Sequence, residues 1–188
     1  MFTGITECIY EKKDVILFNS YAKGEVECLS NLHACRLVYE GLEFNSSEQL
    51  FFWLRLSNSP KHQEMLMKCN TPQQVKTRGS GYLKTIKYQS RPEDDIPLLR
   101  LALQVKFNQC YEFRNFITRH SNSRFVEYAW WGDDTWGAVD IDATLKYDWY
   151  KGVVQGQNIC GRLITELAKK SIVNAVTPVF PHIAPPCN

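Results

Sequence analysis

The sequence predicts a mainly α-helical, multihelical single domain with a few short β-strands near the N-terminus. Signals that start helices recur along most of the chain, whereas runs typical of strands are short and lie before residue 45. The 188 residues fall within the usual size of one domain and can bury roughly two thirds of the surface of the unfolded chain. The chain has no internal repeat and no composition shift that would indicate a second domain.

The strand signals come first. Residues 15–18 form a run too short for a helix and rich in branched and aromatic side chains, which predicts a buried strand. A second strand is expected over residues 34–39, and a turn at Glu40-Gly41 leads into residues 42–44. These segments predict a hairpin just before the first helix.

The first helix is predicted from its capping residues. An acid or amide follows a polar cap three positions later, counting either Asn45 to Glu48 or Ser46 to Gln49. The helix should run to about residue 56.

Later helices begin at similar signals. Ser59-Pro60 and Thr71-Pro72 each place a hydroxyl before a proline whose missing N–H costs nothing at the first helical position. They predict two helices, the second ending before Gly79. Further helices are expected over residues 94–107, 111–120 and 158–170, and four prolines after residue 172 predict an extended tail.

Composition and charge indicate which partners and which cellular compartment to expect. Twenty-two basic and twenty acidic side chains are interspersed, without the Lys and Arg run that a long nucleic acid would favour. Seven cysteines, an odd number without C-x-x-C spacing, indicate a reducing compartment and not a disulfide framework. With no signal-type or membrane-spanning apolar stretch, we expect a soluble, cytoplasmic protein with no membrane partner.

Several short blocks then follow one another between about residues 18 and 167. They are Ser30-Asn31, Ser47-Glu48-Gln49, Thr71-Pro72, residues 103–107 (LQVKF), Val126-Glu127, Asp133-x-x-Trp136-Gly137 and Gly156-Gln157-Asn158-x-x-Gly161. In this order they resemble the NADAR family, also called YbiA-like. The chain departs from the family at Arg55, where a lysine is usual, at Ala138-Val139 in place of the end of W-G-x-G, and in a longer insertion over residues 140–155 that could alter substrate choice.

The resemblance implies a YbiA-like domain over residues 1–176, followed by the Pro-rich tail 177–188. It implies a hydrolase of ribosyl N-glycosidic bonds that needs no cofactor, with phosphoribosylamino-pyrimidines of riboflavin synthesis and ADP-ribosylated guanine as family substrates. The partner would be a small-molecule or base-linked ribosyl nucleotide, including ADP-ribosylated nucleic acid. The implied catalytic residues are Glu48, Lys106 and Asp133, and the implied substrate-binding residues are Asn31, Arg55, Trp136, Gly137 and Asn158.

Glu48 has two interpretations. Positions 48, 52 and 55 share one helix face, so Glu48 and Arg55 can point at one site, where a carboxylate would stabilise a cation-like ribose or activate water. Alternatively, Glu48 is the capping-box acid that accepts from the Asn45 N–H.

Lys106 is expected to be partly buried, because apolar residues surround its position on the helix. Burial can make the amine nucleophilic, so a Schiff-base intermediate is one hypothesis and phosphate binding another. A lysine whose stem covers apolar surface at a helix end is the structural alternative.

Two further segments are candidates for substrate contacts. Trp130, Trp131 and Trp136 lie with carboxylates in one loop, where they could stack on a base or, for the first two, cover the core. Free N–H groups after Gly156-Gln157 could bind a phosphate at the start of the last helix, although Asn158 is also an ordinary cap. Gly161 would permit close approach of another backbone.

Three hypotheses remain open from the sequence. The four histidines are far apart, so the first is a metal-independent enzyme. The second is a non-catalytic ADP-ribose or nucleotide-binding module, suggested by Arg55 and Ala138. The third is an interaction protein that uses the Trp-rich loop and the tail.

Overall fold

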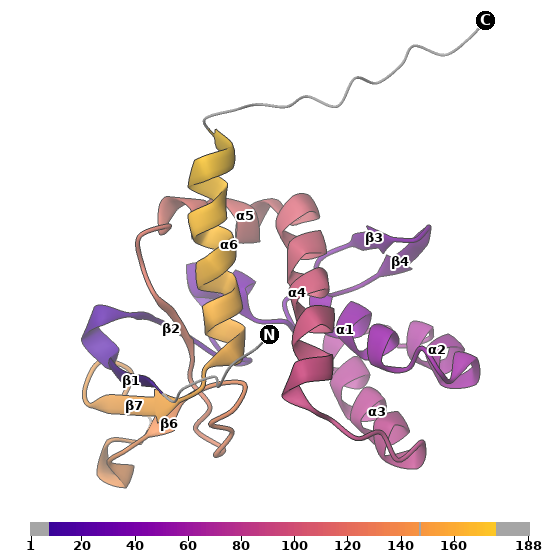
Figure 1. Ribbon diagram of the computed structural model, residues 1–188, viewed down its shortest axis with the longest axis horizontal. Helices are drawn as coiled ribbons and strands as arrows, with labels where there is room; N and C mark the ends of the chain where they lie inside the picture. Colours follow the sequence, from indigo (N-terminus) through magenta and orange to yellow (C-terminus); the bar gives the residue numbers. More distant parts are fainter. Residues whose placement is uncertain (1–7, 147, 176–188) are drawn as a thin grey trace, which may run out of the picture.

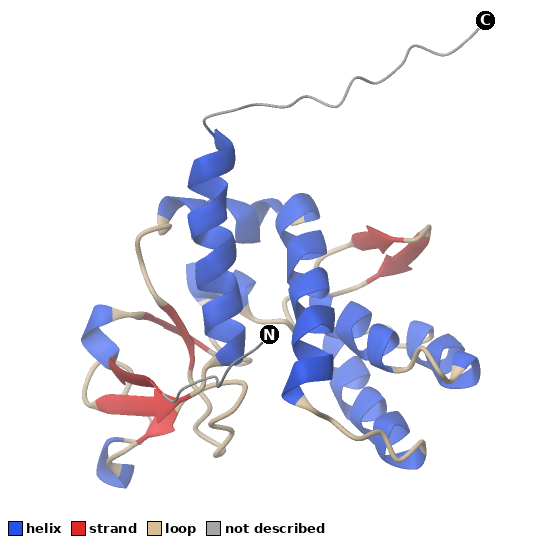
Figure 2. Cartoon of the chain, viewed as in Figure 1, coloured by secondary structure: helices blue, strands red, loops and turns tan. Residues whose placement is uncertain are grey.

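The computed structural model describes residues 8–146 and 148–175, so the predicted tail 177–188 lies outside the described residues. Helices dominate, as the sequence predicts (Figure 2). The α-helices are α1 (Ser47–Arg55), α2 (Pro60–Met67), α3 (Pro72–Thr85), α4 (Pro92–Gln109), α5 (Tyr111–Arg119) and α6 (Ile159–Ala175). Short 3-10 helices are η1 (Lys12–Asp14), η2 (Gly24–Leu29) and η3 (Ala143–Leu145).

The helices α4 and α6 run beside each other through the middle of the molecule, with α5 across one end (Figure 1). Helix α1 packs against both α4 and α3, and α2 lies outside them. The main core lies among α1, α4, α5, α6 and η2, where Leu50, Leu103, Phe113 and Ile164 are fully buried.

The strands form three small sheets. They are β1 (Cys8–Glu11), β2 (Ile16–Phe18), β3 (Leu37–Tyr39), β4 (Leu42–Phe44), β5 (Phe125–Glu127), β6 (Val139–Asp140) and β7 (Val153–Gly156). Antiparallel β1-β7-β6 form one sheet, parallel β2 and β5 another, and the β3–β4 hairpin the third. The expectation that strands lie only near the N-terminus is wrong, because β5, β6 and β7 come from the second half of the chain and pair with early strands or with each other.

The early elements are confirmed with small shifts. The predicted strand at residues 15–18 is β2, and the hairpin turns at Glu40 (φ 50°) and Gly41 (φ 76°), the left-handed pair that a two-residue hairpin turn requires. The second strand is shorter than expected and begins at Leu37.

The predicted end of α3 before Gly79 is wrong, because the helix continues to Thr85. A Cβ on Gly79 would lie 2.6 Å from the ring of Phe52, so this glycine permits close helix packing and does not end the helix. Helix α4 also starts earlier than predicted, at Pro92, since the N–H groups of Asp94 and Asp95 both donate to the Arg91 carbonyl. Pro97 therefore lies inside α4.

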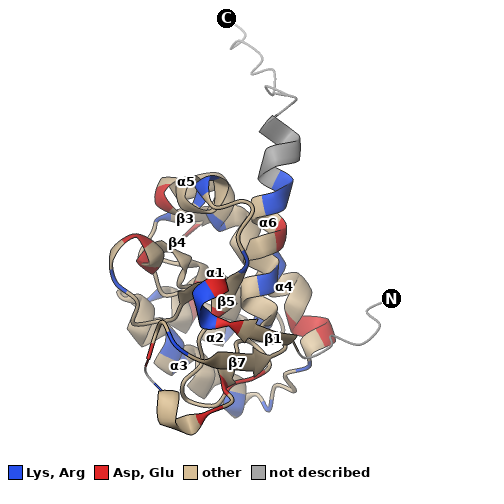
Figure 3. Ribbon diagram, turned by 90° about the vertical axis from the view of Figure 1, so that its left-hand side faces the viewer, with Lys and Arg blue, Asp and Glu red and all other residues tan. Residues whose placement is uncertain are grey.

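The remaining helix predictions hold at their starts, and α6 continues past the expected residue 170 to Ala175. None of the helices within the described ranges is long and apolar enough to cross a bilayer. Basic and acidic residues are interspersed on the face that Figure 3 shows, without one continuous basic stripe.

Candidate functional site

Glu48 lies in the first turn of α1 and is free of the capping role. Ser46 Oγ accepts from the Gln49 N–H at 3.3 Å, and Gln49 Oε1 accepts from the Asn45 N–H at 2.7 Å. The capping box is therefore Ser46 with Gln49, and the alternative that Glu48 caps Asn45 is wrong. The Glu48 N–H donates to the Asn31 carbonyl at 3.0 Å, which fixes the start of α1 against the preceding loop.

The Glu48 carboxyl is half-buried and electrostatically unusual. Burial raises its pKa, while the positive charges of Lys76, Arg55 and Lys106 oppose that rise. Desolvation, the larger effect, favours the neutral acid, and the neighbouring cations favour the carboxylate.

Glu127, at the end of β5, is the second carboxyl of the site. Burial raises its pKa to about 7, and the negative charges of Glu48 and Asp133 add to the rise. A hydrogen bond from Cys160 and the charge of Lys76 act in the opposite direction. The sequence placed Glu127 in a family block but gave it no role; its only signal is a charged residue that ends a short apolar strand.

A chain of hydrogen bonds joins the two carboxyl-bearing segments through Asn31. Ser47 Oγ donates to Asn31 Oδ1 at 3.0 Å, and Asn31 Nδ2 donates to Cys160 Sγ at 3.5 Å. Burial, with the nearby Glu127 charge, holds the pKa of Cys160 well above its usual value, so its thiol keeps the proton that it shares with Glu127. Asn31 thus sits between the start of α1 and the end of β5.

Lys76 on α3 is a cation that sequence reasoning missed. Its charge lowers the pKa of both Glu48 and Glu127, and its Nζ lies 5.5 Å from the ring centroid of Trp131. Trp131 is 44% exposed and can therefore meet a ligand. No local pattern marks Lys76, because only the packing of α3 beside α1 brings it near the carboxyls.

Lys106 is fully buried, more completely than the sequence predicted. Its Nζ donates to the Ser30 carbonyl at 2.6 Å and lies 4.7 Å from the ring centroid of Phe113. Burial lowers the pKa of this amine. In this position Lys106 touches the segment that carries Asn31 and has no surface with which to reach a substrate phosphate or an anomeric carbon.

Arg55 forms a structural ion pair. Its Nη2 lies 3.1 Å from Asp95 Oδ2, and its guanidinium packs near the rings of Phe51 and Tyr88. Asp95, itself fully buried, also accepts from the hydroxyl of Tyr88 at 2.6 Å. Arg55 therefore ties α1 to the start of α4 while its charge acts on Glu48.

The loop that contains Asp133, Trp136 and Gly137 closes onto β5. Asp133 Oδ1 accepts from the N–H groups of Thr135 and Trp136 at 3.1 and 2.9 Å, and its charge acts on Glu127. The partly buried Trp136 ring packs edge-on against Phe51 at 6.0 Å. A Cβ on Gly137 would lie 2.6 Å from the Glu127 carbonyl, so only glycine fits there.

The predicted phosphate site at the start of α6 is wrong. The N–H groups of residues 157, 158, 159 and 160 donate to the carbonyls of Asp134, Gly137, Thr135 and Trp136, so these four donors are not available to a phosphate. Asn158 is buried and has a φ of 49°. Its side-chain amide forms two hydrogen bonds with the β5 backbone: Oδ1 accepts from the Glu127 N–H, and Nδ2 donates to the Phe125 carbonyl. The close approach expected at Gly161 is confirmed, since a Cβ there would lie 2.2 Å from the Phe125 carbonyl.

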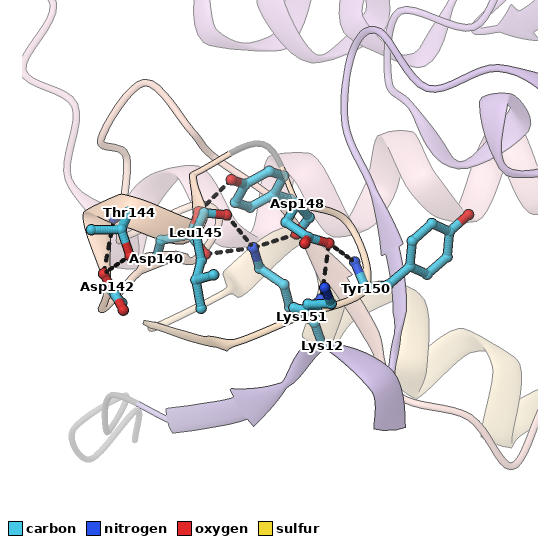
Figure 4. Close-up of polar contacts among 9 residues, drawn as sticks. Lys12, Asp140, Asp142, Thr144, Leu145, Asp148, Tyr150 and Lys151 are labelled. Atoms are coloured by element: carbon cyan, nitrogen blue, oxygen red, sulfur yellow. Dashed lines mark hydrogen bonds and ion pairs between the residues drawn. The ribbon is translucent and has the colours of Figure 1, made fainter.

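The insertion over residues 140–155 is integrated into the fold around Lys12 (Figure 4). The buried Lys12 Nζ lies 2.5 Å from Asp140 Oδ1 and donates to the Asp148 carbonyl at 2.7 Å. The Tyr128 hydroxyl donates to the other Asp140 oxygen. Lys12, which follows β1 as the first residue of η1, thus ties this N-terminal segment to the insertion.

Of the predicted site residues, Glu48 and Asp133 act electrostatically on Glu127, and Asn31 is linked to it through Cys160. Trp136 packs against Phe51 of α1, while Lys106, Arg55, Gly137 and Asn158 make the packing and backbone contacts described above. The profile described as "NADAR domain" matches residues 13–170. The NMR structure of the E. coli protein YbiA, a Northeast Structural Genomics target, matches with a TM-score of 0.63 and 20% identity, covering 90% of this chain and 92% of that chain. No curated protein matches the chain.

Proposed function

The chain belongs to the NADAR family, and on that premise we propose that it is an N-glycosidase that hydrolyses a ribosyl N-glycosidic bond in a nucleotide-derived compound. The observation that carries this proposal is the pair Glu48 and Glu127, two half-buried carboxyls whose pKa values are both raised and whose charges interact. Glycosidic bond cleavage commonly uses two such groups in different protonation states.

Glu127 is the proposed acid. With a pKa of about 7, a large fraction of this group is protonated at neutral pH, so it can donate a proton to the leaving nitrogen as the C1′–N bond breaks. Glu48 is the proposed carboxylate: burial raises its pKa, and the positive charges of Lys76, Arg55 and Lys106 limit that rise. It stabilises the cationic ribose and takes a proton from the water whose oxygen bonds C1′; that proton then returns from Glu48 to Glu127.

The other family positions take supporting roles in this proposal. Asp133 helps keep Glu127 protonated through its negative charge, and Asn31 holds the two carboxyl-bearing segments in register. Lys106 and Arg55 act as positioning residues that set the charge near Glu48. Trp136 borders the substrate, while Gly137 and Asn158 fix the β5 backbone beneath it.

Substrate recognition is assigned to Lys76 and Trp131. An ammonium beside an exposed indole can bind a phosphate while the ring stacks on a base, the two features that ADP-ribosylated guanine and phosphoribosylamino-pyrimidines share. Because Lys76 also faces both carboxyls, a phosphate held there would lie near the proposed reaction centre.

Release of free base, separated by chromatography, tests the proposal. The purified protein and its Glu48→Gln variant are incubated with both substrate classes, with Glu64→Gln as the control because Glu64 is exposed on α2. We expect wild type and Glu64→Gln to release base from one class, and Glu48→Gln to be at least about 100-fold slower with an unchanged circular dichroism spectrum. Binding of a ligand without release from either class would instead indicate the non-catalytic nucleotide-binding module.

A further inference from the structure

A second group of polar side chains lies where the segment after η2 meets the junction of α4 and α5. One ligand atom each from His33, Cys110 and Glu112 lies within 4.8 Å of the other two. The Cys35 thiol adds a fourth donor, since it forms a hydrogen bond with Cys110. Imidazole nitrogen, thiol sulfur and carboxylate oxygen are the donor types that zinc takes in proteins.

The fold brings these residues together from two distant stretches of chain. Cys110 is the residue between α4 and α5, and Glu112 lies in the first turn of α5. His33 is fixed by its N–H, which donates to the Ser30 carbonyl at 3.0 Å, and Cys35 by its N–H to the Asn45 carbonyl at 3.0 Å. The backbone thus holds both halves of the cluster before any ligand binds.

Hydrogen bonds link Cys110 to the other members of the cluster. Cys110 Sγ donates to Glu112 Oε2 at 3.5 Å, and the side chains of Cys35 and His33 also form hydrogen bonds with Cys110. A thiol, an imidazole and a carboxylate together are a donor set that suits a borderline-soft divalent cation.

We propose that His33, Cys110 and Glu112, with Cys35 as the fourth donor, form a zinc site. Zn–N and Zn–S bonds of about 2.0 to 2.3 Å require the donor atoms to approach one another by roughly 1 Å. Glu112 is exposed and His33 half-buried, so both side chains have room to rotate.

The proposed zinc ion would have a structural role. His33 and Cys35 follow Ser30 and Asn31, whose carbonyls contact Lys106 and the Glu48 N–H. Zinc would therefore clamp the segment that orients Glu48 onto α4 and α5. The expectation of a metal-independent enzyme rested on the separation of the histidines along the sequence; the proposed ion uses only one of them and takes no part in bond cleavage.

Competition with a chromophoric chelator measures zinc binding by the full-length protein, kept in a non-thiol reductant and first freed of metal. We expect one equivalent of zinc, and affinity at least about tenfold weaker in His33→Ala and in Glu112→Gln. His62→Ala and Glu64→Gln are matched controls, since His62 is also half-buried and Glu64 also exposed. Both control variants should bind zinc with the affinity of wild type.

Cobalt(II) provides a second readout that does not depend on stability. A thiolate-to-cobalt absorption band should appear in wild type and be lost in Cys110→Ser, and bound zinc should protect Cys35 and Cys110 from alkylation. Absence of stoichiometric zinc, equal affinities in His33→Ala and His62→Ala, or alkylation of Cys35 and Cys110 that zinc does not slow would overturn the proposal.

Discussion

At the scale of single residues, the fate of each acidic side chain depends on its neighbours. Glu48 lies two residues after Ser46, which caps α1, yet Gln49 and not Glu48 completes the capping box. The sequence alone left that choice open because either pair has the required spacing. Glu127 was overlooked for a different reason: its pKa depends on Glu48, Asp133 and Cys160, which only the fold brings to it.

The raised pKa of Glu127 predicts a stability cost. Its pKa rises from the ordinary 4.5 to about 7 in the folded protein, so between these values the folded state binds more protons than the unfolded state. Stability should therefore fall as pH rises through this range. Because the side chain is partly exposed, we expect Glu127→Gln to raise the free energy of unfolding by about 1 to 2 kcal/mol at pH 8.

Urea unfolding at pH 5 and pH 8 measures this effect. The gain in Glu127→Gln should shrink towards pH 5, where wild-type Glu127 is itself mostly protonated. Glu64→Gln, an exposed control, should change stability by no more than about 0.5 kcal/mol at either pH. A loss of stability in Glu127→Gln at pH 8 would contradict the assigned pKa.

At the scale of secondary-structure elements, local signals predicted starts better than ends. The Ser46 cap, the Thr71 cap and the Glu40-Gly41 turn each work through neighbours within three residues, so the sequence carries the whole signal. The end of α3 was mispredicted because Gly79 was interpreted as a helix breaker. Its role depends on Phe52 of another helix, which no local pattern reveals.

Two glycines of α3 give a matched test of this explanation. Gly81 has open space at its Cβ position, so Gly81→Ala should raise the free energy of unfolding by about 0.5 to 1 kcal/mol through helix propensity. Gly79→Ala places a methyl group 2.6 Å from the Phe52 ring and should lower it by about 1 to 3 kcal/mol. Thermal unfolding of the two variants should shift in opposite directions; equal stabilisation of both would refute the packing role.

At the scale of the whole molecule, the sheets join distant parts of the chain. Strand β2 pairs with β5 and β1 with β7, partners more than 100 residues apart, so hydropathy patterns could not predict them. Hydropathy patterns could not predict the contacts of the insertion over residues 140–155 either, because the sequence shows it only as an added segment. The two ends of the insertion lie in β6 and β7, which form one sheet with β1, and Lys12 contacts the insertion from the N-terminal side.

The Lys12–Asp140 pair should therefore matter for overall stability. Both side chains are buried, so Lys12→Met leaves an unpaired carboxylate and should lower the free energy of unfolding by about 3 to 5 kcal/mol. Adding Asp140→Asn should recover much of that loss, because the unpaired charge is removed. Chemical denaturation of the two single variants and the double variant measures the coupling; additive losses would show that the pair is not coupled.

The central claim is that Glu127 donates a proton while Glu48 remains ionised, and the pH dependence of base release tests it most directly. In wild type, kcat/KM should fall about tenfold per pH unit above a pKa of about 7, as the Glu127 proton is lost. Glu127→Gln should be at least about 100-fold slower near pH 6, and its kcat/KM should not show the fall above pH 7. The control Glu64→Gln should have the same pH profile as wild type. A wild-type rate that is flat or rising through pH 7, or near-normal activity in Glu127→Gln, would contradict the account.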